Sequence, residues 1–459
     1  MPNKKTALLI GLGPLATEPD QKFIAAPSIR SWQFLQAALW NNHAVIVTKN
    51  LGPDQETGFN KIRDSRECIH YSTRENLHAT GNFIRSLCKE HQFSSVTIIG
   101  STSLAELLPY IPDNLPLWFD LNGSVLAEGQ VKAAVEDNNQ ILDYYLNLEY
   151  QSLIKGDIFS AVSTPQKHTV IGELALIGRL NSYTTDYPFC HVIPDTYFPQ
   201  PDHKKENVLR GKKIKDNAFI VLWSGGFNNW ADEKTLFNGL EKAMRTDDSI
   251  YFAATGGRIE GVAHRVFDNF YQRVQSSQFK DRFFFEGWVD GSLIPSYYRE
   301  ADLAINIDLP SWETYLGARN RFLGWIYFDL PILTTALCEF AGDLASHRGC
   351  YTFEAGSAES LSKALINICQ SPAREREATA KRARALFLEE YTVETIMQCY
   401  SRWLENPAKS PDNQYYRSHA LKFSSYTPLS PDKMVIEGKE NTRGIERYLK
   451  NIWKRIKKK

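Results

Sequence analysis

The chain has 459 residues, of which 43% are hydrophobic and 12% aromatic, and it carries 53 basic and 53 acidic side chains. This length suits two globular domains with additional segments, and the composition excludes an intrinsically disordered chain. The balanced charge argues against nucleic-acid binding, because it creates no overall attraction to a polyanion. The seven cysteines contain no CxxC pair, and no run approaches the ~20 apolar residues of a membrane span. We therefore expect a cytoplasmic protein with reduced thiols.

Apolar strand-like runs alternate with amphipathic segments along most of the chain, which is the pattern of a parallel α/β fold. In the first half, the runs at 6–13, 44–48 and 95–100 are separated by segments of helical period at 28–42 and 78–91. Further runs follow at 115–123, 158–163 and 191–194, with helices predicted at 141–156 and 173–180. These elements predict a first Rossmann-like domain.

The second half restarts the same alternation at 218–226 and 249–257 and ends in predicted helices at 357–371 and 374–405. A polar, aperiodic stretch at 195–217 is the candidate linker between the halves. We predict domains at 1–195 and 196–404, followed by an extended tail and a basic helix at 405–459.

Two glycine turns end neighbouring strands of the second half. Ser224, Gly225 and Gly226 close the first strand, and Gly256 and Gly257 close the next. Glycines let a backbone approach a phosphate, and free N–H groups at the start of a helix favour an anion. The alternative is a pair of tight turns that bind no ligand.

The stretch SWETYLGARNRFLGW, residues 311–325, has a helical period with an arginine on its apolar side. In a single helix, Arg319 would lie among leucine and aromatic side chains, while Glu313, Gly317 and Arg321 would line a small polar face. A guanidinium among apolar residues needs an anionic partner. That partner is either a bound diphosphate or a structural carboxylate, and Glu313 either contacts sugar hydroxyls or stabilises the start of the helix.

The order of several motifs in the second half resembles the group 1 (retaining) GT-B glycosyltransferases. These motifs are VLWSGGFNNWADEKTLFNGLEKAM, FAATGG, FFFEGWV, YYREADLAIN and ETYLGARNRFLGWIYFDLPILTT, followed by the helix at 374–404. The first half resembles the acceptor domain of this family more loosely, through PSIRSWQFLQAAL, LPLWFDLNG and DIFSAVSTPQ. The resemblance implies two Rossmann-like domains that face a central cleft, with the nucleotide sugar on the second domain.

Two departures from the family affect the expected site. The family has a second glutamate where this chain has Arg321, and it has an Arg and Lys pair that is missing after Gly226. Arg319 and Arg321 are expected to supply the lost positive charge. Asp120 lies at a strand end where the family often has a sugar-facing histidine, so Asp120 and Glu313 are the candidate catalytic residues.

Two weaker assignments concern the first strand. Gly11 and Gly13 are expected on the acceptor side of the cleft. Their GLG motif also suggests a dinucleotide site, but the later glycine is absent and Pro14 blocks the helix entry. For Asp120 the alternative is a local turn with Asn122 and Gly123. We expect no metal ion and no cofactor other than the donor substrate.

The last segment, 443–459, combines apolar residues at helical spacing with basic residues on the other faces. Such a helix suits an anionic membrane interface, so the protein is expected in the cytoplasm, with peripheral attachment to the inner face of the membrane. The alternative is a helix packed on the protein body.

The predicted activity is metal-independent transfer of a hexosyl group from a nucleotide sugar to a carbohydrate or lipid-linked acceptor hydroxyl, in glycan or glycolipid biosynthesis. The resemblance implies retention at the anomeric carbon. Two alternatives stay open: a nucleotide-sugar epimerase on the same fold, and a GT-B-like binding or assembly protein without catalysis.

Overall fold

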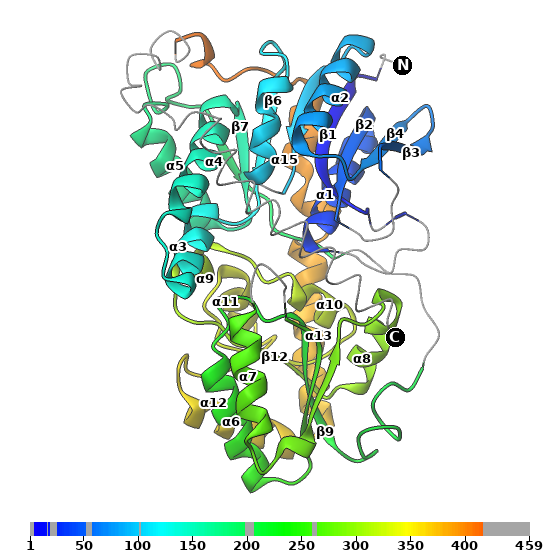
Figure 1. The fold of residues 1–459 in the computed structure, drawn as a ribbon, viewed down its shortest axis with the longest axis vertical. Coiled ribbons are helices and arrows are strands. Elements are labelled where there is room, and N and C mark those ends of the chain that lie inside the picture. The colour runs from blue at the N-terminus through cyan, green and yellow to red at the C-terminus, as the bar shows by residue number, and fades with distance from the viewer. Residues whose placement is uncertain are drawn as a thin grey trace. The chain divides into compact units, whose positions relative to one another are not determined.

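The computed structural model describes residues 4–15, 17–18, 25–51, 57–100, 102–197, 206–258 and 264–415. These residues form two compact units, coloured from blue to red along the chain in Figure 1. Among the described residues, unit 1 contains those up to 196 and those from 392 to 415, and unit 2 contains those from 197 to 391. The unit boundary thus falls after Thr196, and the segment predicted to end the second domain at 404 divides between the units. The predicted tail helix at 443–459 lies outside the described residues.

Unit 1 is built on an eight-stranded sheet in the order β3-β4-β2-β1-β5-β6-β7-β8. Every neighbouring pair is parallel except β3 and β4, which are antiparallel. The strands are β1 (Thr6–Gly13), β2 (His43–Asn50), β3 (Phe59–Asp64), β4 (Cys68–Thr73), β5 (Ser95–Ile98), β6 (Leu117–Leu121), β7 (Ile158–Ala161) and β8 (Cys190–Val192). The central strands β1 and β2 are buried and mostly apolar because helices cover both faces of the sheet.

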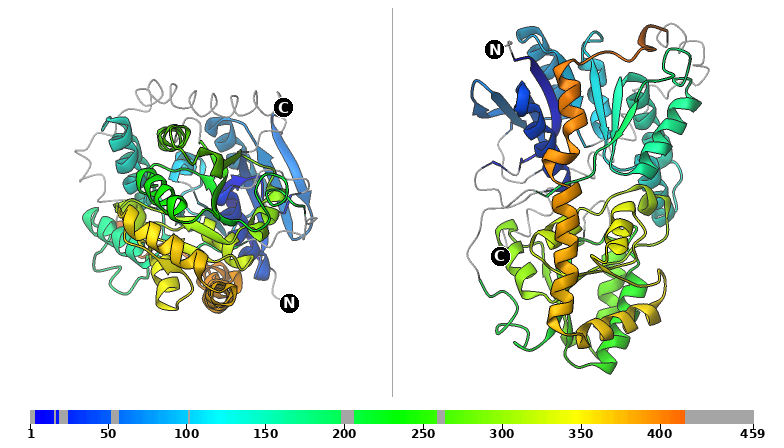
Figure 2. Two further views of the ribbon diagram at one scale, coloured as in Figure 1. Left: turned by 90° about the horizontal axis from the view of Figure 1, so that it is seen from below. Right: turned by 180° about the vertical axis from the view of Figure 1, so that it is seen from behind.

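Helices of unit 1 come from both ends of the described chain. They are α1 (Ala26–Asn41), α2 (Leu77–Glu90), α3 (Val125–Glu136), α4 (Ile141–Lys155), α5 (Thr164–Leu176), α14 (Val393–Ile396) and α15 (Gln398–Glu405), with a 3₁₀ helix η1 (Thr102–Tyr110). Helix α15 runs along one face of the sheet and contacts α1 (Figure 2). Phe34 of α1 and Tyr400 of α15 meet edge to face, with ring centroids 4.8 Å apart. The far end of the described chain is therefore part of the core of unit 1.

Unit 2 is built on a six-stranded parallel sheet in the order β11-β10-β9-β12-β13-β14. Its strands are β9 (Phe219–Gly226), β10 (Ile250–Gly257), β11 (Phe283–Gly287), β12 (Leu303–Asn306), β13 (Ile332–Thr334) and β14 (Tyr351–Thr352). Its helices are α6 (Glu233–Thr246), α7 (Arg265–Gln275), α8 (Ile294–Glu300), α9 (Trp312–Leu316), α10 (Arg321–Tyr327), α11 (Glu339–Ser346), α12 (Ala358–Gln370) and α13 (Ala373–Glu390), with 3₁₀ helices η2 (Lys280–Arg282) and η3 (Gly291–Leu293). Separate apolar clusters pack on the two faces of this sheet. The predicted α/β class with two Rossmann-like halves is confirmed.

Two predicted elements were wrong in detail, and one hairpin was not predicted. Residues 374–405 form three helices, because α13 ends at Glu390 and the Thr392 side chain accepts a hydrogen bond from Thr395 N to cap α14. No separate helix spans 173–180, since α5 ends before Gly178, which has a φ of +84°. The hairpin of β3 and β4 was missed, because charged side chains interrupt the apolar alternation of β3.

Glu149 of α4 and Glu173 of α5 form a carboxyl pair in unit 1. Burial raises the pKa of Glu149 well above its usual range and that of Glu173 to about 7. Because both folded-state pKa values exceed those of an unfolded glutamate, the pair favours folding at low pH. We expect the free energy of unfolding to fall as pH rises from about 4.5 to 7. Urea unfolding across this range checks the prediction, and Glu173→Gln should flatten the profile; an equally steep profile in the variant would contradict it.

Candidate functional site

The candidate site of unit 2 lies where β9, β10 and β12 end. Strand β9 has β10 on one side and β12 on the other, and the carboxyl ends of parallel strands at such a switch point form the usual ligand site of an open α/β sheet. Gly225, Gly256 and Gly257 have φ values of +94°, +88° and +125°, which favour glycine. A Cβ on Gly256 would lie 2.5 Å from the carbonyl oxygen of Gly225, whereas a Cβ on Gly225 would meet no atom within 4 Å. The turn at Gly225 therefore borders open space, whereas the turn at Gly256 packs against the backbone of Gly225.

The helix that follows the first turn does not supply free N–H groups in the way the sequence suggested. Helix α6 begins at Glu233, several residues after Gly226, and the Asp232 side chain accepts a hydrogen bond from Thr235 N at 3.0 Å. The prediction that the start of a helix lies at the glycines was wrong, and the Asp232 side chain caps the helix instead.

Arg321 reaches from the start of α10 to the first glycine turn. Its Nη2 donates to the carbonyl oxygen of Gly226 at 3.0 Å, and its guanidinium carbon lies 4.3 Å from the centroid of the Trp223 ring. The Nη1 atom is buried and has no hydrogen-bond partner among the described residues. Burial lowers the pKa of Arg321 to about 10, although the Asp308 carboxylate opposes this change, so the side chain stays protonated at neutral pH. Among the described residues, this cation beside the turn has no carboxylate in contact.

Arg319 has a different environment, because two buried carboxylates surround it. Its Nε donates to Asp308 Oδ2 at 3.0 Å, and its two terminal nitrogens form a fork with Glu313 at 3.1 and 2.9 Å. Asp308, Glu313 and Arg319 are all buried. Burial raises the pKa of Glu313, and Arg319 opposes this effect. The geometry is that of a structural ion pair, the alternative that the sequence had left open.

The single helix predicted for 311–325 was wrong. Helix α9 ends at Leu316, and a turn with Gly317 and Arg319 leads to α10. A Cβ on Gly317 would lie 2.7 Å from the carbonyl oxygen of Glu313 and 3.3 Å from Arg319 Nη1. Gly317 is therefore needed for the fork between Arg319 and Glu313, and the helical face predicted for these residues does not exist.

Ser224 holds aromatic side chains in place beneath the first turn. Its hydroxyl accepts a hydrogen bond from Trp325 Nε1 at 2.9 Å and lies 3.3 Å from the hydroxyl of Tyr298. This contact fixes α10, and with it Arg321, against the end of β9. Ser224 therefore positions the residues of the site through Trp325 and Tyr298, whereas Gly225, Gly226 and Arg321 border the site itself.

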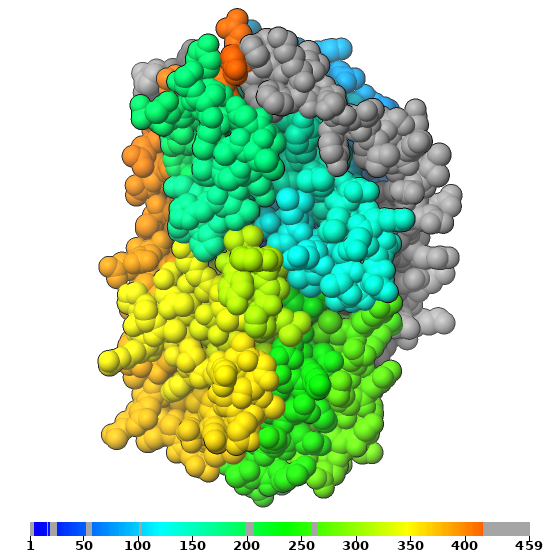
Figure 3. All heavy atoms as spheres, turned by 90° about the vertical axis from the view of Figure 1, so that its left-hand side faces the viewer, coloured from blue at the N-terminus to red at the C-terminus, as the bar shows by residue number. Residues whose placement is uncertain are grey.

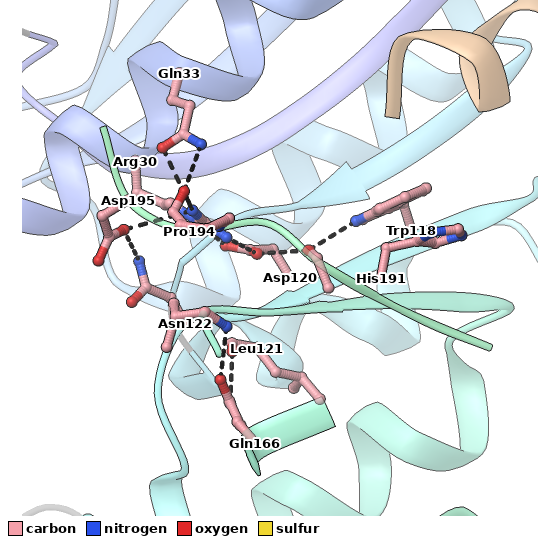
Figure 4. Close-up of polar contacts among 12 residues, drawn as sticks. Arg30, Gln33, Trp118, Asp120, Leu121, Asn122, Gln166, His191, Pro194 and Asp195 are labelled. Atoms are coloured by element: carbon pink, nitrogen blue, oxygen red, sulfur yellow. Dashed lines mark hydrogen bonds and ion pairs between the residues drawn. The ribbon is translucent and has the colours of Figure 1, made fainter. Parts of the chain in front are cut away.

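In unit 1, Asp120 is fully buried in a polar network (Figure 4). Arg30 of α1 donates to both carboxylate oxygens, at 3.0 and 2.7 Å, and the Ser160 hydroxyl donates at 2.6 Å. The remaining guanidinium nitrogen of Arg30 donates to the carbonyl oxygen of Pro194 at 2.8 Å and lies 3.4 Å from Asp195. Asp120 therefore holds α1 and the end of β8 to the sheet, and the local turn with Asn122 that was its alternative is not formed. The sequence signal for Arg30 was an arginine within an amphipathic helix, the same signal that identified Arg319.

Gly11 and Gly13 of β1 make room for neighbouring side chains. A Cβ on Gly11 would lie 2.4 Å from Ser31 Oγ, and a Cβ on Gly13 would lie 2.9 Å from Thr48 Oγ1. Ser31 Oγ accepts a hydrogen bond from Leu12 N at 2.9 Å, so α1 is bound closely to the strand. These contacts give both glycines a packing role. Their location on the acceptor side of the cleft stays a prediction.

The close contact at Gly11 predicts a stability effect. Gly11→Ala should lower the free energy of unfolding by about 1–3 kcal/mol, the usual cost of overpacking a core. A matched control is Gly172→Ala in α5, where a Cβ meets no atom within 4 Å and alanine favours the helix. Urea unfolding of both variants checks this, and equal stability of the two would contradict it.

Among the described residues, no group of three or more His, Cys, Asp or Glu side chains could hold a metal ion. In the same part of the chain, no helix is both long and apolar enough to cross a membrane. The absence of metal and cofactor and the cytoplasmic location stay predictions.

Two units with parallel Rossmann-like sheets define the GT-B class of fold, the class that the motifs resemble. A scan of protein-family models and a search of curated proteins find no match to the sequence. Solved structures do match. "Trehalose-6-phosphate from E. coli bound with UDP-2-fluoro glucose" has a TM-score of 0.64 and 10% identity and covers 88% of this chain and 100% of that chain.

Two further structures agree with this fold. The sucrose-phosphate synthase from Thermosynechococcus elongatus has a TM-score of 0.59 and 16% identity, and the match covers 92% of this chain and 100% of that one. An alpha,alpha-trehalose-phosphate synthase (UDP-forming) from Burkholderia xenovorans, in complex with glucose-6-phosphate, has a TM-score of 0.60 and 9% identity and covers 88% and 100%. The resemblance to GT-B glycosyltransferases is therefore confirmed at the level of the fold.

Proposed function

We propose that the protein is a glycosyltransferase that moves a hexosyl group from a nucleotide sugar to an acceptor hydroxyl of a carbohydrate or lipid-linked molecule. The donor diphosphate would lie against the first glycine turn of unit 2, next to Arg321. The observation that carries this proposal is the buried Nη1 of Arg321, which lacks a hydrogen-bond partner among the described residues. A buried guanidinium nitrogen without a partner is costly, and a phosphate oxygen is a good acceptor for it.

The comparisons support a nucleotide-sugar donor and a sugar-phosphate acceptor. One similar structure is described with bound UDP-2-fluoro glucose, and another is a UDP-forming synthase in complex with glucose-6-phosphate. The fold places the carboxyl ends of β9 and β12 where open α/β sheets bind ligands. The position of the donor at the turn of unit 2 is proposed from the sheet geometry, and the kind of donor and acceptor from the comparisons.

The proposed reaction breaks the bond between the anomeric carbon and the diphosphate oxygen and forms a bond from that carbon to the acceptor oxygen. Negative charge grows on the leaving diphosphate, and Arg321 would stabilise it by a charge-assisted hydrogen bond in a site with little water. The acceptor hydroxyl loses its proton to the leaving group or to solvent. This role for Arg321 needs no metal ion, and retention at the anomeric carbon is the expectation that the resemblance gives.

Asp120 and Glu313, the predicted catalytic carboxylates, are assigned positioning roles in this proposal. Asp120 is bound by Arg30 and Ser160, and Glu313 is bound by Arg319. Glu313 and Asp308 hold the turn from which α10 starts, and Arg321 projects from that helix. The proposal therefore uses no side-chain nucleophile.

A turnover assay tests the proposal. The chain is incubated with UDP-, GDP-, ADP- and dTDP-hexoses, with and without sugar phosphates as acceptors, and release of nucleoside diphosphate is followed. Acceptor-dependent release with a new glycoside supports the transferase. Conversion of the donor sugar without an acceptor indicates the epimerase instead, and binding without turnover indicates the non-catalytic protein.

A further inference from the structure

Trp223 is the last large side chain of β9 before the first glycine turn, and it is 1% exposed. It belongs to the apolar cluster of unit 2 that contains side chains of α6 and α12. The atoms of these two helices form part of the green and yellow surface of unit 2 in Figure 3. A tryptophan at this place fills the core, but its polar and cationic contacts lie at the turn.

The indole of Trp223 restricts the shape of the first glycine turn. Its Nε1 donates a hydrogen bond to the carbonyl oxygen of Gly225 at 3.2 Å, and its ring stacks on that of Phe227, with centroids 4.4 Å apart. Phe227 N donates to the carbonyl oxygen of Gly257 at 2.9 Å, so the two glycine turns are joined. Because glycine is the most flexible residue and Gly225 has a φ of +94°, these contacts are needed to hold the turn.

The same ring lies against the guanidinium of Arg321. Arg321 begins α10, which packs in the apolar cluster on the opposite face of the sheet from Trp223. Its side chain therefore crosses the end of β9, and its guanidinium carbon lies 4.3 Å from the centroid of the Trp223 ring. Its Nη2 donates to the carbonyl oxygen of Gly226 at 3.0 Å. The ring and the carbonyl oxygen together determine where this cation lies.

An aromatic face stabilises a buried cation without neutralising it. The quadrupole of an indole attracts a guanidinium, and tryptophan is the best aromatic partner. A carboxylate would also stabilise the cation, but it would compete with a phosphate for the same N–H groups. Arg319 has this other environment, because Asp308 and Glu313 accept hydrogen bonds from it. The contact with Trp223 instead leaves the charge of Arg321 and its Nη1 available to an anion.

We propose that Trp223 is a positioning residue for the donor diphosphate, because it holds Arg321 and the first glycine turn in the arrangement that binds the phosphates. This inference rests on the proposed function, since it requires a diphosphate at this turn. Trp223 does not contact the donor and acts mainly through Arg321. A tryptophan of β9 and an arginine of α10 thus take the place of the Arg and Lys pair that is missing after Gly226.

A double-mutant cycle tests this inference. Titration calorimetry with UDP, GDP, ADP and dTDP identifies the diphosphate that the wild-type chain binds most tightly. Its affinity is then measured for Trp223→Leu, Arg321→Ala and the double variant. Trp223→Leu should weaken binding about tenfold in the wild-type chain but less than about threefold in the Arg321→Ala chain. A residue that acts through Arg321 loses its effect once Arg321 is gone, so the same factor in both chains would overturn the inference.

A matched control separates positioning from packing. Phe252 of β10 is fully buried in the same apolar cluster, where its ring lies near those of Phe270 and Phe283. Phe252→Leu should lower the melting temperature and leave the diphosphate affinity unchanged. If it weakens binding as much as Trp223→Leu does, the loss reflects packing alone and the inference is wrong.

Trp223→Phe keeps the test decisive if the leucine variant does not fold. Phenylalanine retains a ring beside Arg321, but it is a weaker partner for a cation and lacks the N–H group that donates to Gly225. Its diphosphate affinity should fall about threefold. Wild-type affinity in the folded phenylalanine variant would overturn the inference.

The results distinguish this inference from the proposed function. If the wild-type chain binds a diphosphate and Trp223 has the same effect with and without Arg321, the inference fails and the proposed function stands. If the wild-type chain binds none of the four diphosphates, both fail.

Discussion

Replacing Arg321 by alanine is expected to weaken the binding of nucleotide sugars by about 10- to 100-fold. A hydrogen bond to a charged group contributes about 1.5–3 kcal/mol, and each 1.4 kcal/mol is a factor of ten in affinity. The Arg321 guanidinium donates to the carbonyl oxygen of Gly226 and packs over the Trp223 ring. Its Nη1 has no hydrogen-bond partner among the described residues, so it is available to a phosphate oxygen of the donor. Isothermal titration calorimetry with a donor that the wild-type chain binds measures the change.

The control for Arg321 is Arg384→Ala. Arg384 pairs with the part-exposed Asp329 at 3.0 Å and donates to the carbonyl oxygen of Tyr327, at the opposite end of α10 from Arg321. Its loss should leave donor affinity unchanged, because these contacts lie away from the glycine turn. The Arg321 variant should stay folded, because Arg321 forms no ion pair with the described residues. If a folded Arg321→Ala protein binds the donor as tightly as the wild type, Arg321 does not contact the donor.

Replacing Arg319 by alanine is expected to lower the free energy of unfolding of unit 2 by about 3–5 kcal/mol. Removing one partner of a buried ion pair leaves an uncompensated charge, and here two carboxylates, Asp308 and Glu313, lose their cation. The pKa of Glu313, already raised by burial, would rise further. A raised folded-state pKa favours folding at low pH, so the loss should be larger at pH 8 than at pH 5.

Thermal unfolding of the Arg319 variant at both pH values checks this result. The double variant Arg319→Met and Glu313→Leu is the informative comparison, because removing a cation and a carboxylate together costs less than removing the cation alone. A wild-type melting temperature in Arg319→Ala, together with a loss of donor affinity, would contradict the structural role. It would instead indicate the phosphate contact that the sequence had predicted for Arg319.

The fold was predictable from sequence because strand periodicity and glycine turns are local signals. The buried runs at β1, β9 and β10 are continuous and end in glycine, so both sheets could be recognised. The hairpin of β3 and β4 could not be recognised in this way, because charged residues interrupt the apolar pattern of β3.

The site was harder to predict, because the partner of a side chain depends on distant contacts. An arginine in an apolar helix indicates a buried cation, but it does not say which carboxylate is near. The fork between Arg319 and Glu313 lies across the turn at Gly317, where α9 ends, and the single helix assumed from the sequence did not include this turn. Arg30 and Asp120 are 90 residues apart in sequence, and neither position predicts the other. The structure separates two arginines that the sequence had grouped: Arg319 pairs with two carboxylates, and Arg321 pairs with none of the described ones.

Equilibrium titration of the wild-type chain with nucleoside diphosphates and the matching nucleosides tests the central proposal most directly. If the glycine turn and Arg321 bind a diphosphate, at least one of UDP, GDP, ADP and dTDP should bind, and its nucleoside should bind at least about 100-fold more weakly. A nucleoside that binds as tightly as its diphosphate, or no binding by any of the four diphosphates, would contradict the proposal.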